Sequence, residues 1–196
     1  MGEPLVSIVS AGMSKFGRRD GVYGRELFLE AFKELIDRSP NLDPKKDIKA
    51  LFLGQMCEGF ERQGHSGPTA VGWAGLSPKA AVRTEAACAS AGDAVRYGMS
   101  MIMAGFYDIV IAGGFEKMTN LSTAQATELI AGADDFHFDQ WSGLTFPGFF
   151  ALAAVAHMYK YGTKEEDLAR ISVKSHKNGA LNPKAHFQKT ITLKKA

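Results

Sequence analysis

The sequence is poor in cysteine: its 196 residues include only Cys57 and Cys88. Two cysteines cannot build the disulfide framework on which small secreted proteins depend, so we expect both thiols to be free, in a reducing compartment. The sequence also lacks a basic region leading into a long apolar one, which is the pattern of a secretory signal. These absences favour a cytoplasmic location.

An excess of charge of one sign is missing as well. Lysine and arginine total 23, aspartate and glutamate total 21, and the formal net charge is +2. We therefore expect no nucleic-acid partner and no polybasic contact with a membrane surface. No apolar run approaches the length of a membrane span. No GxGxxG or P-loop spacing of glycines is present to bind phosphates.

Hydrophobic residues make up 45% of the chain, which is enough for a sizeable core. Their spacing predicts strands that alternate with helices, the order that is typical of a layered α/β core. The expected strands are residues 5–12, 48–53, 80–86 and 109–112, and the expected helices are residues 25–37, 67–75 and 88–104. The last of these strands is apolar at every position, as in a parallel sheet that is covered on both faces.

The character of the sequence changes after residue 117. The expected features there are a loop-rich stretch at 119–147, helices at 148–160 and from residue 163 onward, and a tail at 179–196 that is loop with a short final strand. Thr163 and Glu166 have the spacing of a capping box, in which a Ser or Thr and an acid three residues later satisfy the first backbone N–H groups of a helix. The pattern divides the chain into a core domain, 1–117, and a cap lobe, 118–196.

Cys88 stands between an expected strand and an expected helix, in the stretch Glu-Ala-Ala-Cys-Ala-Ser-Ala-Gly. A helix N-terminus offers unpaired N–H groups and a partial positive charge, and both favour a thiolate. The small neighbours leave room for a substrate, and the same N–H groups suit the oxyanion of an attacked thioester. The residues allow a nucleophile for acyl transfer, but a small cysteine packed between strand and helix explains the pattern equally well. For Cys57, which has no base or helix end nearby, we expect a packing role.

A second feature is Ala-Gly-Gly-Phe-Glu-Lys-Met at 112–118, where paired glycines permit close approach of the backbone to a helix or a ligand. Cys88 within Ala-Cys-Ala-Ser-Ala-Gly-Asp-Ala-Val, followed after one helix and one strand by this stretch, resembles the N-terminal half of a thiolase. That family has Cys-Ala-Ser/Thr-Gly at its acylated cysteine and Ala-Gly-Gly-x-Glu-x-Met at a strand end. Ala91 stands where the family usually has glycine. The lobe stretch Gly-Leu-Thr-Phe-Pro-Gly is similar to the sterol-carrier-protein and archaeal branch.

The resemblance implies an α/β fold, a thiolase-like layered α/β/α core of which this chain holds the N-terminal half, with an inserted, mostly helical cap lobe. It also implies acyl transfer between thioesters of the acetyl-CoA and acetoacetyl-CoA class, with Cys88 as the acylated residue. Coenzyme A thioesters would then be substrates, with no tightly bound cofactor and no metal. Gly114 and Met118 would lie behind the acyl pocket, and His137 would contact coenzyme A. Because thiolases are usually dimers or tetramers, we expect a homo-oligomer.

Thiolases also use histidines and a second cysteine that move protons, in motifs of their C-terminal half. None of the five histidines here lies in such a motif; they are His65, His137, His157, His176 and His186. We therefore expect either a truncated or split thiolase or a chain that associates with a second chain supplying that half, and we expect this chain to expose a sheet edge and an apolar face. Two other functions stay open. One is a non-catalytic acyl-CoA- or lipid-binding or scaffold subunit of a thiolase complex. The other is a condensing enzyme of the ketoacyl- or hydroxymethylglutaryl-CoA-synthase kind.

Overall fold

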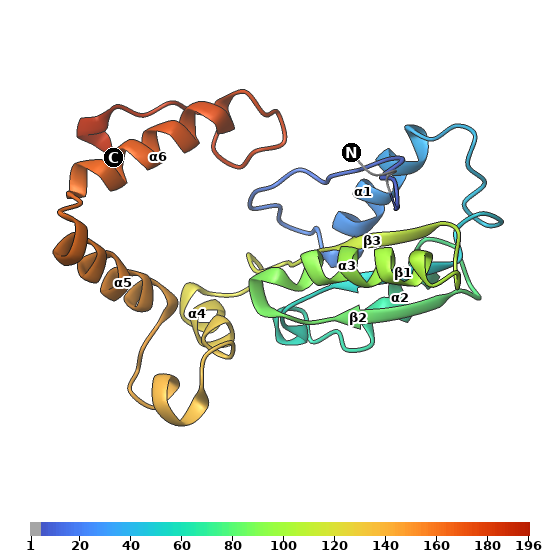
Figure 1. The fold of residues 1–196 in the computed structure, drawn as a ribbon, viewed down its shortest axis with the longest axis horizontal. Helices are drawn as coiled ribbons and strands as arrows, with labels where there is room; N and C mark the ends of the chain where they lie inside the picture. Colours follow the sequence, from blue (N-terminus) through green and yellow to red (C-terminus); the bar gives the residue numbers. More distant parts are fainter. Residues whose placement is uncertain (1–4) are drawn as a thin grey trace. The chain divides into compact units, whose positions relative to one another are not determined.

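A computed structural model describes residues 5–196, and the chain divides in it into two compact units. The first, here called the core unit, contains the chain up to residue 14 and residues 20–121. The second, the helical unit, contains residues 15–19 and 122–196. Figure 1 shows the elements of both units. The first four residues of the predicted core domain lie outside the described residues.

A three-stranded parallel sheet forms the centre of the core unit (Figure 1). Strand β1 (Ala50–Gly54) lies between β2 (Ala80–Thr84) and β3 (Val110–Gly114). Its last residue is aligned with the last residue of β2 on one side and of β3 on the other. Since parallel strands end at the same edge of a sheet, the segments that follow all three strands begin side by side.

Helices cover both faces of this sheet. The helices of the core unit are α1 (Gly24–Asp37), α2 (Ser66–Trp73) and α3 (Ser90–Met103). Side chains alternate along β1, so that Leu51 and Leu53 join a buried cluster with α1 and α2, while Phe52 packs with α3. All five residues of β1 are buried. The predicted α/β/α layering is therefore confirmed.

The predicted strands 48–53, 80–86 and 109–112 are confirmed, but the strand predicted over 5–12 is wrong. The side chains of Ile8 and Val9 are exposed. The segment lies along α1 and does not pair with a strand. Ser10 Oγ donates to the carbonyl of Leu35 at 2.8 Å, and a Cβ added at Gly12 would lie only 1.9 Å from a carbonyl oxygen of α1. The apolar, β-branched composition does not produce a strand here, because contacts with α1 hold the backbone.

The helical unit contains more helix than the sequence predicts. Its elements are α4 (Thr123–Ala131), the π-helical turn η3 (Phe136–Gln140), α5 (Phe146–Tyr161), α6 (Glu165–Ala180) and the 3-10 turn η4 (Leu193–Lys195). The stretch 119–147 is therefore not mainly loop, and the predicted final strand is a 3-10 turn. Helix α4 starts at a capping box of Ser122 and Gln125 that the sequence analysis overlooked.

The start of α6 also differs from the prediction. The N-cap residue is Lys164 instead of Thr163, and the acid that binds its backbone is Asp167 instead of Glu166. The N–H of Lys164 donates to the Asp167 carboxylate at 3.0 Å. The Thr163 hydroxyl is engaged elsewhere, at 2.9 Å from His157 Nδ1. Glu166 and Asp167 are adjacent in the chain, and the backbone conformation at the start of α6 brings Asp167 within hydrogen-bond distance of the Lys164 N–H.

Among residues 5–196, the structure has no helix that combines the length and the apolar character needed to span a bilayer.

Candidate active site

Cys88 lies in the turn that joins β2 to α3. This turn is the 3-10 segment η2 (Ala87–Ala89), and α3 begins directly after it, at Ser90. The Cys88 side chain is exposed, so the alternative of a small buried cysteine does not hold for it. Within the described part of the chain no hydrogen bond or ion pair engages its sulfur. The thiol therefore stands at a helix start, open to solvent, as the nucleophile hypothesis requires.

Polar contacts of Ser90 fix the backbone of this turn. Ser90 is 4% exposed. Its hydroxyl accepts from the N–H of Ala86 at 2.9 Å and donates to the carbonyl of Ala87 at 2.7 Å. The Thr84 hydroxyl donates to the Ser90 carbonyl at 3.0 Å. Ala87 has φ +47°, in the left-handed region that costs an alanine about 1–2 kcal/mol. The network holds the turn in this conformation and thereby orients Cys88.

We predict that Ser90→Ala lowers the free energy of unfolding by about 1–3 kcal/mol, because two half-buried backbone groups, the N–H of Ala86 and the carbonyl of Ala87, lose their partner. Urea denaturation followed by circular dichroism measures the change. The matched control is Ser100→Ala in the same helix, where the exposed hydroxyl donates only to the carbonyl of Arg96. That variant is expected to stay within about 0.5 kcal/mol of the wild type. Equal effects of the two substitutions would contradict a special role of Ser90 in the turn.

At two glycines, Gly54 and Gly114, the ends of β1 and β3 are packed too closely for a side chain. A Cβ on Gly54 would lie 2.4 Å from the nitrogen of Ala91, and a Cβ on Gly114 would lie 2.0 Å from the carbonyl oxygen of Gly54. Gly113 has nothing within 4 Å of such an atom. The close approach expected of the glycine pair is therefore made by Gly114, toward the neighbouring strand. Its place behind an acyl pocket remains a prediction.

The other predicted binding residues lie in different units. Met118 is half-buried in the core unit, four residues after the end of β3, and its carbonyl accepts from the N–H of Leu121 at 3.1 Å. His137 is exposed on η3 of the helical unit, where its ring meets that of Phe136 edge-on at 5.3 Å. The structure thus places Cys88, Gly114 and Met118 on segments that leave or follow the same edge of the sheet. The roles of Met118 and His137 stay predictions.

Two polar residues that the sequence analysis did not select cross the same edge of the sheet. Glu116 accepts from the backbone N–H groups of Met56 at 2.5 Å and Cys57 at 3.3 Å. Arg83 donates to the carbonyl oxygens of Gln55 and Met56, both at 3.2 Å. Burial raises the pKa of the Glu116 carboxyl, and the two N–H groups and the charge of Arg83 oppose this shift only in part. The available signal in the sequence is a single acid two residues after an apolar strand.

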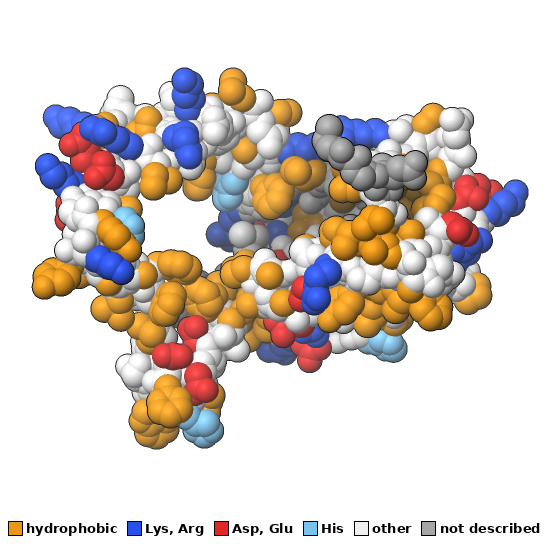
Figure 2. All heavy atoms as spheres, viewed as in Figure 1, with side chains coloured by type: hydrophobic (Ala, Val, Ile, Leu, Met, Phe, Trp, Pro, Cys, Tyr) orange, Lys and Arg blue, Asp and Glu red, His pale blue; other side chains and the backbone are white. Residues whose placement is uncertain are grey.

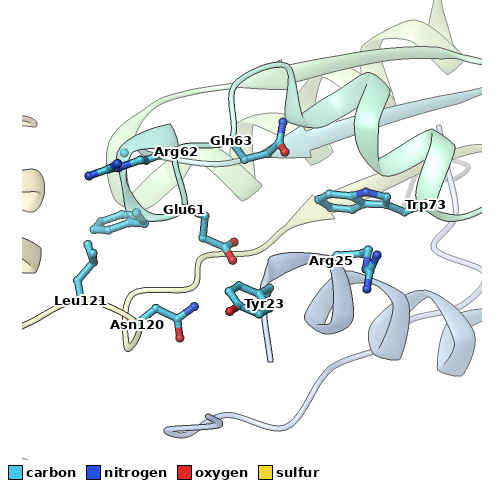
Figure 3. A pocket seen from close by; sticks show the side chains of 10 residues that line it. Tyr23, Arg25, Glu61, Arg62, Gln63, Trp73, Asn120 and Leu121 are labelled. Carbon is cyan, nitrogen blue, oxygen red and sulfur yellow. The ribbon is translucent and has the colours of Figure 1, made fainter. Parts of the chain in front are cut away.

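The core unit also contains a cavity of about 420 Å³ that includes none of the predicted site residues. In Figure 3, Tyr23 and Arg25 come from the start of α1, and Glu61 and Trp73 line the cavity from the segment after η1 (Glu58–Phe60) and from α2. Both carboxylate oxygens of Glu61 accept from the N–H of Gly24, at 2.9 and 3.0 Å. The charge of Glu61 therefore stabilises the start of α1. Over residues 5–196, no cluster of three or more His, Cys, Asp or Glu side chains is suited to hold a metal ion.

Fold and site together define an α/β protein with an accessible cysteine at a strand-to-helix turn above a parallel sheet. Comparison with known families then identifies the particular one. Residues 6–195 match the family described as Thiolase, N-terminal domain. The chain belongs to the thiolase family, and the resemblance seen in its motifs is confirmed.

Individual relatives agree with this assignment. The chain is 38% identical to the acetyl-CoA acetyltransferase of Methanothermobacter thermautotrophicus, over 96% of this chain and 48% of that protein. It is 30% identical to sterol carrier protein 2 of Oryctolagus cuniculus, over 97% of this chain and 36% of that protein. A solved structure described as an Ltp2-ChsH2(DUF35) aldolase aligns with 95% of this chain and 47% of the chain in that structure, with a TM-score of 0.68 and 22% identity. This likeness shows the fold. The chain spans about half the length of the acetyltransferase.

Proposed function

We propose that this chain carries the acyl-accepting half of a thiolase that moves acyl groups between thioesters of the acetyl-CoA and acetoacetyl-CoA class. The observation that carries the proposal is the exposed Cys88 at the joint of β2 and α3, in a chain of the thiolase family. Coenzyme A thioesters are the proposed substrates. The two free thiols fit a reducing compartment such as the cytoplasm.

In the proposed reaction the Cys88 thiolate attacks the carbonyl carbon of an acyl-CoA and forms a sulfur–carbon bond. Backbone N–H groups at the start of α3 stabilise the oxyanion that develops. The bond to the coenzyme A sulfur then breaks, and the released thiolate takes up a proton. In the second half, coenzyme A or the carbanion of another acyl-CoA attacks the acyl-cysteine and restores the Cys88 thiolate. Gly114 and Met118 are proposed behind the acyl group, and His137 in contact with coenzyme A.

The proton transfers need groups beyond those that contact Cys88 in this structure. We propose that a segment equivalent to the C-terminal half of thiolases, in the same or in another polypeptide, provides them. Positioned acids and bases contribute about 10²- to 10⁴-fold to such reactions. The surface of α3 fits a need for further packing, since its apolar side chains are exposed over much of its length (Figure 2): Val95, Tyr97, Met99, Met101 and Met103. We also propose a homo-oligomer on this basis.

The test is to incubate the chain with acetyl-CoA, alone and together with a C-terminal half taken from the archaeal acetyltransferase. Intact mass spectrometry is expected to find one acetyl group, and peptide mapping to place it within residues 85–95. The mixed sample is expected to form a complex and to cleave acetoacetyl-CoA in the presence of coenzyme A. A mixed sample that forms the complex without acylation would contradict the catalytic proposal.

A second candidate function is a binding or scaffold subunit. It is favoured by one observation, the similarity over 97% of this chain to sterol carrier protein 2. In that case the chain binds acyl-CoA with unchanged affinity after Cys88→Ala, and no acetyl adduct forms in any sample. The third possibility, a condensing enzyme of the synthase kind, is not favoured, because the family match is to thiolases.

A further inference from the structure

The proposed chemistry assigns no role to Glu116, although its side chain is half-buried at the edge of the sheet where the strands end. The residue follows the end of β3 by two positions, and its Oε1 binds two successive backbone N–H groups, those of Met56 and Cys57. These groups belong to the segment 55–58, which leaves the end of β1. The side chain therefore ties the exits of β3 and β1 together.

Arg83 holds the same segment from the opposite side. Its guanidinium donates to the carbonyl oxygens of Gln55 and Met56, at 3.2 Å each, and to the Glu58 carboxylate at 3.0 Å. The N–H groups of Met56 and Cys57 are thus bound by a residue that follows β3, and the carbonyl oxygens of Gln55 and Met56 are bound by a residue of β2. An anion binds the donors and a cation binds the acceptors, and hydrogen bonds of this kind are roughly twice as strong as neutral ones.

The segment is in turn connected to the turn that carries Cys88. The N–H of Gln55 donates to the carbonyl of Thr84 at 3.1 Å, and the Thr84 hydroxyl donates to the carbonyl of Ser90 at 3.0 Å. Gly54, directly before the segment, leaves no room for a Cβ against the start of α3. A continuous series of contacts therefore leads from Glu116 through the segment 55–58 to the residues that flank Cys88.

From these contacts we infer that Glu116 is a positioning residue for Cys88: its carboxylate fixes the segment 55–58, and this segment supports the turn that presents the thiol. The inference rests on the proposed acyl transfer for its functional meaning. The contacts between Glu116, the segment 55–58 and the turn of Cys88 do not depend on that proposal.

The surroundings of Glu116 make its charge sensitive to pH. Burial is the main cause that raises its pKa above the ordinary 4.5, and the charge of Glu61 raises it further. Arg83, from β2, lowers it and is itself paired with Glu58. The adjacent Lys117 binds the hydroxyl of Thr119. A protonated carboxyl accepts more weakly than a carboxylate, so the segment is held less firmly once Glu116 is protonated.

The test compares Glu116→Gln with the wild type. Glutamine has the same shape and an acceptor oxygen but no charge. We expect the acetylation rate of Cys88 to be about five- to ten-fold lower in the variant at neutral pH, the size of the difference between a charge-assisted and a neutral hydrogen bond. The ratio of the two rates is expected to fall toward one as the pH drops through the raised pKa of Glu116. Groups other than Glu116 titrate in both proteins, so their effect on the rate cancels in the ratio.

The matched control is Glu61→Gln, which changes a nearby glutamate that binds α1 and not the segment 55–58. It should leave the rate at neutral pH unchanged and move the pH-dependent step of the rate to lower pH, because one repelling charge is gone. A rate ratio for Glu116→Gln that is constant across pH would indicate a merely structural role and overturn the inference. A loss of rate in Glu61→Gln as large as that in Glu116→Gln would also overturn it, since Glu61 binds α1 and not the segment 55–58.

Alkylation of Cys88 by iodoacetamide, mapped by peptide mass, provides a readout without coenzyme A. If the wild type takes up no acetyl group even in complex with the C-terminal half, the proposed function fails, and the alkylation ratio alone decides on Glu116. The same five- to ten-fold difference with the same pH dependence then supports the positioning role, and equal alkylation at every pH refutes it. Exchange of the Met56 and Cys57 amide hydrogens is expected to be faster in Glu116→Gln by a similar factor.

Discussion

Replacing Gly114 with alanine is expected to lower the free energy of unfolding by about 3 kcal/mol or more, as severe overpacking in a core does. The added Cβ would lie 2.0 Å from the carbonyl oxygen of Gly54 and 2.9 Å from its carbonyl carbon. These are backbone atoms of the central strand, so they can move only if the pairing of β1 with β3 changes. Because Gly54 itself contacts Ala91 at the start of α3, the displacement also reaches the turn of Cys88.

Gly113→Ala is the matched control for this prediction. It adds the same methyl group one residue earlier in the same strand, where nothing lies within 4 Å. We expect a change within about 0.5 kcal/mol. Urea denaturation of both variants measures the difference. If both substitutions destabilise equally, or if neither does, the close contact of the two strand ends does not determine the stability of this edge.

Elements whose signal lies within a few residues could be predicted from the sequence. The run Ile-Val-Ile-Ala at 109–112 and the run at 48–53 are apolar at nearly every position, and both form strands that are packed from two sides. The segment 5–12 has similar composition but is not a strand. Composition indicates that a segment can adopt an extended conformation, but a strand also needs a neighbouring strand to pair with. Here a hydrogen bond between Ser10 and Leu35, 25 residues apart, fixes the segment against α1 instead.

The same distinction explains which site residues could be found. Cys88 was accessible to sequence analysis because its small neighbours and the strand-to-helix joint are adjacent to it in the chain. The role of Glu116 depends on Met56, 60 residues away, and that contact exists only because β1 and β3 are aligned end to end. Gly54 is a single glycine at a strand end, and only its distance to Ala91 shows why a side chain is excluded.

Substitution of Cys88 by alanine is expected to abolish acetylation by acetyl-CoA, because the sulfur is the proposed attacking atom. Cys88→Ser is expected to react at least about 10³-fold more slowly, since a hydroxyl is a much weaker nucleophile without a positioned base. Neither change should alter the free energy of unfolding by more than about 0.5 kcal/mol, because the side chain is exposed and its sulfur makes no hydrogen bond in the described chain. Time-resolved intact mass spectrometry measures the rates.

The other thiol provides the control for this experiment. Cys57 is half-buried, and its sulfur accepts from the N–H of Gly59 at 3.2 Å, so it helps to shape the turn after β1. Cys57→Ala is expected to lose about 1 kcal/mol of stability with that weak contact and to keep the acetyl adduct on the remaining cysteine. An adduct that persists in Cys88→Ala and disappears in Cys57→Ala would identify Cys57, after the end of β1, as the nucleophile. The turn held by Ser90 would then have only a structural function.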